Sequence, residues 1–456
     1  MKSDPRREAL LRRTFVDFWQ MSEFVREPLI LERAEGLYCW DTDGKRYFDA
    51  IGGIFVAVLG HRHPRVMEAM RRQMDRMTFA PPLHGIADVA LDFVEKIGTV
   101  TPGNLKYVKP FSGGSESTEA AMKFVRQYFK QTGRPAKYKF VSRYYGFHGS
   151  TAGAMSASGT GSRKSKFEPQ MAGFLKVFPP TYYRGRFPTW EECNRFAAQS
   201  IEDVIVHEDP ETVAGVIVEP IGNTGGIITP TEEYFRIIRD ICDRYQVALI
   251  FDEVITGFAK TGSMFAAQTF GVTPDLLCCG KGISSGAVPM GAMIAREDWA
   301  DAFWGPAESG IQFAHGNTFA GNPLACAAGI AVIDEIVEKK LCEKAVRLGE
   351  HLAAKLEGLK RHGVVREVRG KGILRGVELV RDTTSLAPFP ELGNALKKTA
   401  LRNGLIMRVD PGWFAVAPPL VAEESDIDEM CGLIEKSLVE ALEQTESAHR
   451  RAVIQA

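Results

Sequence analysis

Three short apolar runs decide the fold of this chain: VAGVIVEP (213–220), VALIFDE (247–253) and DLLCCG (275–280). Each run has the length of one buried strand and ends at an acid, a proline or a glycine. Longer stretches of helical pattern separate the runs, and this alternation is typical of βαβ units with a mostly parallel sheet. Ligands of such sheets bind beyond the carboxyl ends of the strands. The side chains at these ends are therefore the candidates for chemistry.

The pattern of apolar runs and helical stretches along the chain predicts a large domain and a smaller one. KYVKPF (106–111) and KYKFVS (137–142) predict two more strands of the large sheet. After about residue 330 the pattern changes to helices mixed with short strands, which indicates a second, smaller α+β domain. GLYCWDTDGKRYFDAIGG (36–53) predicts a hairpin turning at Asp43 and Gly44. We expect a large domain over residues 80–330 and a small domain formed by residues 1–79 and 331–456.

Composition excludes several classes of protein. The 456 residues carry 56 Lys and Arg against 57 Asp and Glu, a net charge of -1, which argues against nucleic acid as a partner. No apolar run approaches the roughly 20 residues that span a bilayer, so no membrane partner is expected. The charged start of the chain does not resemble a signal peptide. The eight cysteines are scattered without a C-x-x-C pair, which favours free thiols and the cytoplasm.

A glycine pair follows the strand that ends at Phe111. In SGGSE (112–116) it precedes the helical pattern TEAAMKFVRQYF (118–129). Backbone N–H groups at such a helix start can bind an anion, and the helix dipole favours phosphate there. The alternative is an ordinary turn with Ser115 as the N-cap. Because the spacing matches neither G-x-G-x-x-G nor the P-loop, a single phosphate is the better prediction.

Asp252 and Glu253 end the run VALIFDE. One carboxylate at this edge could hold a cationic nitrogen or a metal ion, and a helix cap or salt bridge is the structural alternative. No H-E-x-x-H or EF-hand spacing occurs and the histidines are dispersed, so we expect no metal.

Lys281 stands between Gly280 and Gly282, directly after another apolar run. A lysine is usually a solvated surface residue. Apolar flanks favour a desolvated amine, which loses its proton more readily and becomes a nucleophile toward carbonyl groups. The residues alone leave both readings open.

Taken in order, these features resemble the class III aminotransferases, which have the fold type I architecture and use pyridoxal 5'-phosphate (PLP). The resemblance extends over nearly the whole chain. It rests on DTDGKRYFDAIGG (41–53), SGGSESTEAAMK (112–123), FHGSTAGAMSASG (147–159), VEPIGNTGG (218–226), IFDEVITGFAKTG (250–262), GKGISSGAVPMGA (280–292), HGNTFAGNPLACAA (315–328) and RGKGILRGVEL (369–379).

The resemblance assigns roles around the cofactor. Lys281 matches the lysine that forms the internal aldimine and later moves the α-proton, and Asp252 matches the acid that binds the pyridinium nitrogen. Gly114 and Ser115 match the backbone that holds the phosphate. Thr318 matches a threonine that reaches the phosphate of the neighbouring subunit, which implies a homodimer with shared active sites and leaves a tetramer open.

Other matching positions surround the cofactor ring. Val254 matches the residue on one face of the ring, and Phe147 matches an aromatic residue on the other, where the family more often has tyrosine. Stacking does not need the missing hydroxyl. His148 and Glu219 match residues near the cofactor, although structural roles would explain both equally well.

The substrate side resembles the branch of ω-amine:pyruvate transaminases. Arg408, ahead of Pro418 and Pro419, matches an arginine that can grip a carboxylate. Related branches gate this arginine with a glutamate, where this chain has Thr224. Phe55 and Phe79 match aromatic walls of the substrate pocket, with plain core packing as the alternative.

The resemblance thus implies an aminotransferase that moves an amino group from a primary amine or ω-amino compound to pyruvate or a similar keto acid. Its cycle would be ping-pong, through the Lys281 aldimine. The alternative is a class III isomerase, either an aminomutase or an amino-acid epimerase. A fold that has lost turnover and only binds ligands is a further, weaker alternative.

Overall fold

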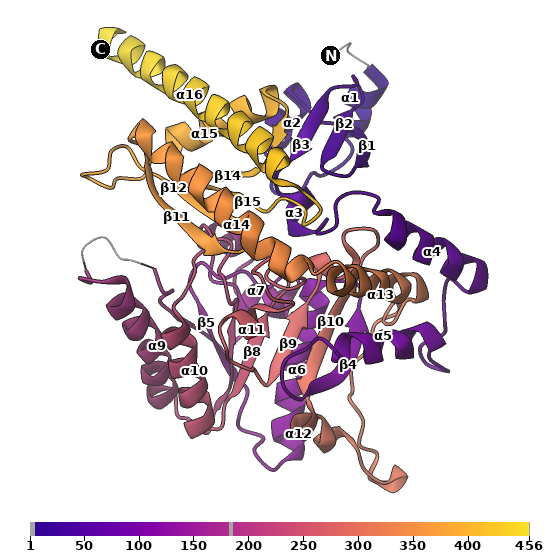
Figure 1. Cartoon of the computed structure of the whole chain (residues 1–456). Helices are drawn as coiled ribbons and strands as arrows, with labels where there is room; N and C mark the ends of the chain where they lie inside the picture. The colour runs from indigo at the N-terminus through magenta and orange to yellow at the C-terminus, as the bar shows by residue number, and fades with distance from the viewer. Residues whose placement is uncertain (1–4, 182–185, 456) are drawn as a thin grey trace.

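A seven-stranded sheet lies at the centre of the computed structural model, which describes residues 5–181 and 186–455 (Figure 1). The strand order is β4-β10-β9-β8-β7-β5-β6. Strands β6, β5, β7, β8 and β9 are parallel, whereas β10 is antiparallel to both β9 and β4. Strand β4 therefore points the same way as β9. The strands are β4 (Leu105–Phe111), β5 (Lys139–Arg143), β6 (Phe174–Val177), β7 (Val213–Val218), β8 (Ala248–Asp252), β9 (Leu276–Cys279) and β10 (Gly291–Arg296).

Helices cover both faces of this sheet because alternate strand residues point to opposite sides. Leu249 and Phe251 of β8 pack in one core with helices α9 (Trp190–His207) and α10 (Glu232–Arg244). Ile250, between them, packs in a separate core with α6 (Gly114–Gln131). The strands consequently read as unbroken apolar runs, as expected for a sheet buried on both faces.

A third core joins the large sheet to the rest of the chain. Helix α13 (Pro323–Glu338) packs against α4 (Pro64–Arg76) and α5 (Asp88–Gly98). Their apolar residues share one cluster with Leu277 of β9 and Ile294 of β10. The short helices around the sheet are α7 (Ala152–Ala157), α8 (Gly161–Lys164), α11 (Ala266–Thr269) and α12 (Glu297–Ala300).

Two four-stranded sheets lie above the large sheet in Figure 1, together with the N-terminal helices and the long C-terminal helix. One has the order β1-β2-β3-β13, so the N-terminal hairpin pairs with a strand from far along the chain; the other has the order β11-β12-β15-β14. Their strands are β1 (Leu31–Glu35), β2 (Tyr38–Asp41), β3 (Arg46–Asp49), β11 (Val365–Lys371), β12 (Leu374–Leu379), β13 (Leu405–Ile406), β14 (Arg408–Asp410) and β15 (Trp413–Val416). The accompanying helices are α1 (Pro5–Leu11), α2 (Met21–Arg26), α3 (Gly52–Phe55), α14 (Leu341–Glu357), α15 (Pro390–Arg402) and α16 (Glu424–Gln455).

The architecture confirms the predicted α/β class, with a large mostly parallel sheet and a smaller α+β part. The antiparallel pairing of β2 with β3 confirms the predicted hairpin. Strands β6 and β10 were not predicted: β6 is a short edge strand that contains Lys176 and buries only Val177, and β10 follows a loop rich in glycine. The domain limits at residues 79/80 and 330/331 stay a prediction, and α13 runs through the second of them. None of the helices in the described ranges is long and apolar enough to cross a membrane.

Candidate active site

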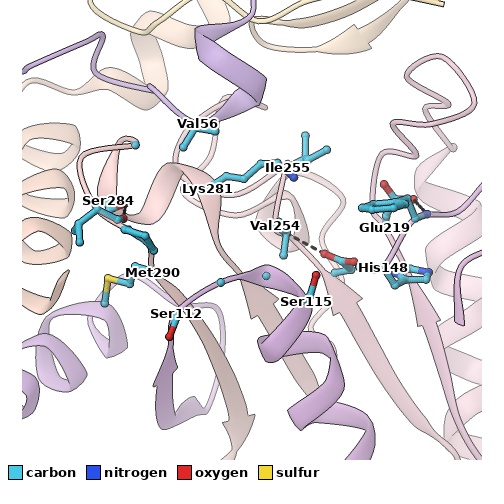
Figure 2. A pocket seen from close by; sticks show the side chains of 18 residues that line it. Val56, Ser112, Ser115, His148, Glu219, Val254, Ile255, Lys281, Ser284 and Met290 are labelled. Atoms are coloured by element: carbon cyan, nitrogen blue, oxygen red, sulfur yellow. Dashed lines mark hydrogen bonds and ion pairs between the residues drawn. The ribbon is translucent and has the colours of Figure 1, made fainter. Parts of the chain in front are cut away.

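A cavity of about 420 Å³ lies at the edge of the large sheet where β7, β8 and β9 end (Figure 2). Glu219 follows β7, Asp252 ends β8, and Lys281 lies two residues beyond β9. Since β4 runs in the same direction as β9, its carboxyl end brings the glycine loop to the same edge. The predicted site residues that line the cavity are Gly114, Ser115, Phe147, His148, Glu219, Asp252, Val254 and Lys281.

Lys281 reaches across this cavity, with Val56 above it and Ser115 below it in Figure 2. Burial lowers the pKa of its ammonium group below the usual value for lysine. The carboxylates of Asp252 and Glu219 oppose this shift. Lys281 also has a φ of +45°, a left-handed conformation that residues with a side chain rarely adopt and that is often retained at functional sites. The structure thus favours the nucleophilic reading over that of a solvated surface lysine.

Asp252 is held by two hydrogen bonds at the end of β8. Its Oδ2 lies 2.9 Å from Nδ1 of His148, and its Oδ1 accepts the backbone N–H of Val254 at 3.1 Å. Asp252 and His148 are both buried. This arrangement fixes the carboxylate at the cavity wall, where it can hold a cationic nitrogen of a ligand. It also gives His148 an orienting role that does not require contact with that ligand.

The N-terminus of α6 lies below Lys281 in Figure 2 and faces the cavity. Gly113 is the N-cap residue and supplies no side chain, so the first N–H groups of the helix are left for a ligand. Ser115 is the second residue of the helix rather than its cap, and its Oγ accepts the backbone N–H of Ser150 at 3.1 Å. A Cβ on Gly114 would lie 2.8 Å from two carbon atoms of Val254. Glycine is therefore required for this close approach, and the N–H groups of the first turn can bind an anionic group.

Glu219 supports the loop that carries Phe147. One carboxylate oxygen accepts the N–H of Phe147 at 3.0 Å and the other accepts the N–H of Asn223 at 3.2 Å. Arg143 donates to the backbone carbonyl of Glu219. Burial raises the pKa of the Glu219 carboxyl, and Asp252 adds to this rise. Glu219 therefore positions Phe147 at the cavity wall in addition to lining the cavity itself.

The model of the family described as "Aminotransferase class-III" matches residues 21–438. The chain belongs to the class III aminotransferases. It is 32% identical over 429 residues to a putrescine–pyruvate aminotransferase of Pseudomonas aeruginosa, covering 93% of each chain. It is also similar to a thermostable (S)-enantioselective ω-transaminase from Thermomicrobium roseum, with 34% identity, a TM-score of 0.91 and coverage of 97% of this chain and 100% of the other. A PLP-bound amine transaminase from an uncultivated Pseudomonas species matches with 30% identity and a TM-score of 0.88, covering 94% and 99% of the two chains.

Four residues that the family pattern suggested do not line the cavity in a single chain of this aminotransferase. Phe55 is only 1% exposed and belongs to a buried apolar cluster that also contains Ile51 and Ala417, while its neighbour Val56 lines the cavity. Phe79 is exposed and packs edge-on against Phe319, the residue after Thr318. Thr318 is exposed as well.

Arg408 is the fourth of these residues and begins β14. Its Nε donates to Asp410 at 2.9 Å, whereas its buried Nη2 has no hydrogen-bond partner among the described residues. The positive charge of Arg408 contributes to lowering the pKa of Lys281, which places the two groups in the same neighbourhood. Thr224, at the position of the gating glutamate, supplies no carboxylate. Nη2 of Arg408 is thus a free hydrogen-bond donor close to the cavity.

Sequence reasoning did not select several residues of the cavity wall. Val56, Ile255, Ser284 and Met290 line it without titratable chemistry, and Figure 2 places Ser284 and Met290 on the side away from His148. Three of them follow Asp252 or Lys281 closely in motifs already noted. Their short distance from Asp252 or Lys281 in the sequence was an indication that they line the site, but the direction of a side chain in a loop cannot be predicted from sequence.

One group of possible metal ligands lies outside this cavity. Among the described residues, Cys39, Asp49 and His61 place one ligand atom each within 4.8 Å of the others. His61 Nε2 lies 2.7 Å from Asp49 Oδ2 and 3.5 Å from Cys39 Sγ. Asp49 also accepts the N–H groups of Ile51 and Gly53. These contacts explain why the three side chains lie together. His61 and Asp49 form an ion pair, and this pair shapes the loop that leads to Val56.

Proposed function

We propose that this aminotransferase binds PLP in the cavity around Lys281 and transfers an amino group from a primary amine or ω-amino compound to pyruvate or a similar keto acid. The observation that carries the proposal is the convergence of three features on one cavity. These are the half-buried Lys281, whose ammonium pKa is lowered by desolvation, the fixed carboxylate of Asp252 and the uncapped start of α6.

Each feature matches one part of the cofactor. The start of α6 and Ser115 suit its phosphate, Asp252 suits its ring nitrogen, and Val254 and Phe147 suit the two faces of its ring. Lys281 suits the aldehyde, because its lowered pKa increases the fraction of free amine. When bound, PLP supplies an electron sink for the negative charge that develops at the substrate carbon.

The chain's own residues then perform the proton chemistry. A carboxylate at Asp252 keeps a neighbouring ring nitrogen protonated, and His148 holds that carboxylate in place. With PLP held there, Lys281 Nζ would serve as the base that takes the proton from the substrate α-carbon and delivers it to the former aldehyde carbon of PLP. Val254 and Ile255 line this region with apolar side chains.

The preference for pyruvate is inferred from Arg408. Its unpaired Nη2 suits the single carboxylate of a small keto acid, and no glutamate at position 224 competes for it. The relative from Pseudomonas aeruginosa is named for putrescine and pyruvate, which supports this choice. Because donor and acceptor would use the same cavity in turn, the kinetics should be ping-pong.

We also infer a homodimer with shared active sites. Thr318 is exposed and lies outside its own chain's cavity, in keeping with a role at the cavity of a second subunit. The eight free cysteines favour a reducing compartment, which supports the cytoplasm.

Borohydride trapping tests the central proposal. After addition of PLP and reduction, digestion should yield one labelled peptide containing Lys281, and a label elsewhere would refute the assignment. Primary amines, diamines and ω-amino acids are then assayed against pyruvate and 2-oxoglutarate. Parallel initial-velocity lines and alanine as product are expected. Conversion of one compound without any keto acid would instead indicate the isomerase.

A further inference from the structure

Arg143 ends β5 at the sheet edge where β7 and β8 also end, and its side chain is buried. The residue is only 2% exposed. Its Nη2 donates to the backbone carbonyl of Glu219, whereas its buried Nη1 has no hydrogen-bond partner among the described residues. In the described part of the chain, no carboxylate pairs directly with this guanidinium group. A positive charge is therefore buried near the cavity without a directly bound counter-ion.

The carboxylate of Glu219 holds two backbone groups at the cavity wall. One oxygen accepts the N–H of Phe147 at 3.0 Å and the other accepts the N–H of Asn223 at 3.2 Å. An ionised carboxylate serves both donors. A protonated carboxyl group would turn one oxygen into a donor and leave one of the two N–H groups without an acceptor. The support of Phe147 thus depends on the ionisation of Glu219.

The charged groups that face Glu219 act on its ionisation in opposite directions. Burial raises the pKa of the Glu219 carboxyl and Asp252 raises it further, whereas His148 and Arg143 oppose the rise. His148 is already bound to Asp252 at 2.9 Å. Lys281 also interacts with Glu219, but burial lowers the pKa of its ammonium group. Arg143 is the one cation in this set whose charge does not depend on pH, because a guanidinium group stays protonated in proteins.

Hydrogen bonding alone does not explain an arginine at this position. A glutamine could donate to the carbonyl of Glu219 without the cost of removing a charge from water. The ring of Tyr234 has its centre 5.9 Å from the guanidinium carbon, so a cation–π contact offsets only part of that cost. The Tyr234 hydroxyl has no hydrogen-bond partner among the described residues. The charge of Arg143 is therefore the property that needs an explanation.

We propose that Arg143 is a positioning residue whose charge keeps Glu219 ionised, so that the carboxylate of Glu219 holds the backbone and ring of Phe147 at the cavity wall. The inference rests on the proposed function for the role of Phe147 against the cofactor ring. Arg143 does not line the cavity and acts only through Glu219.

The test measures binding of pyridoxamine 5'-phosphate, which has the ring and the phosphate but no aldehyde, to the cofactor-free protein from about pH 6.5 to about pH 9. R143Q removes the charge and keeps a donor for the carbonyl of Glu219. Its Kd should exceed that of the wild type by about 3- to 10-fold at about pH 6.5, the effect of losing one aromatic contact. The difference should disappear as rising pH ionises Glu219. R143K should restore most of the affinity. Y234F removes only the neighbouring hydroxyl and is the matched control, with a Kd within about twofold of the wild type at each pH.

E219Q distinguishes positioning through Glu219 from a general structural effect. Because this variant has no carboxyl group at position 219, adding R143Q should change its Kd by less than about twofold at any pH. A loss in R143Q that does not depend on pH, or an equal loss in the E219Q background, would show a purely structural role and overturn the proposal.

Infrared difference spectra against E219Q give a readout that needs no ligand. At about pH 6.5 the Glu219 carboxyl group should be ionised in the wild type and in Y234F, and protonated in R143Q. A protonated group in the wild type would overturn the proposal even if R143Q failed to fold. If pyridoxamine 5'-phosphate does not bind to the wild type, the proposed function fails, and the infrared spectra still decide whether Arg143 controls the ionisation of Glu219.

Discussion

Replacing Gly114 by alanine probes the cradle at the start of α6. The added Cβ would lie 2.8 Å from both Cγ atoms of Val254 and 3.4 Å from its Cβ. Carbon atoms in contact normally lie about 3.5 to 4.0 Å apart, so roughly 1 Å of overlap must be relieved. Overpacking of this kind costs about 1 to 3 kcal/mol. The helix propensity of alanine would by itself stabilise the helix by up to about 1 kcal/mol, so a net destabilisation reports the clash.

The assay is the free energy of unfolding of the cofactor-free protein, measured by urea for the wild type, G114A, V254A and the double variant. V254A removes both Cγ atoms that the new methyl group meets. The double variant should therefore be more stable than the sum of the single effects predicts, by about 1 kcal/mol or more. G114A should also weaken binding of inorganic phosphate. Additive effects, or a G114A protein as stable as the wild type, would refute this account of the cradle.

Three further predictions concern charged side chains. Lys281→Ala should lower transamination by more than about 10³-fold and abolish borohydride labelling of that peptide; a retained label would place the reactive amine elsewhere. Asp252→Asn should lower kcat by at least about 100-fold while PLP absorbance shows the cofactor still bound, whereas near-normal turnover would mean that no charge is needed there. Hydrogen bonding to Asp49 raises the pKa of His61 to about 10, so its stabilising effect is complete below about pH 6.5 and lost as the pH rises through 10. The free energy of unfolding should fall by about 2 to 4 kcal/mol over that range, and Asp49→Asn should remove most of the fall.

Much of the site could be predicted from sequence because its residues stand at the ends of buried strands. Asp252 and Lys281 each follow an apolar run, and the direction of parallel strands brings such ends to one edge. The start of α6 could be placed for the same reason. These features depend on periodicity and chain direction, which the order of residues encodes locally.

The remainder depends on loop geometry that local patterns do not encode. Phe55 was expected at the pocket wall, but the φ of +67° at this residue accompanies a tight turn in which Val56 faces the cavity instead. Strand β10 pairs antiparallel with β4 and β9, and this reversed direction depends on long-range pairing that composition does not encode.

The reversed strand β10 has a consequence for how the enzyme becomes active. Because β10 is antiparallel to both β9 and β4, the carboxyl ends of β9 and β4 lie at the same edge of the sheet. Gly114 then lies against Gly280, and a Cβ on Gly280 would lie 3.3 Å from the backbone of Gly114. A nascent chain that has emerged only as far as β8 therefore lacks Lys281 and the wall residues Ser284 and Met290. Contacts between such distant segments form slowly. The ability to bind the cofactor should consequently appear late in folding, after most of the helices have formed.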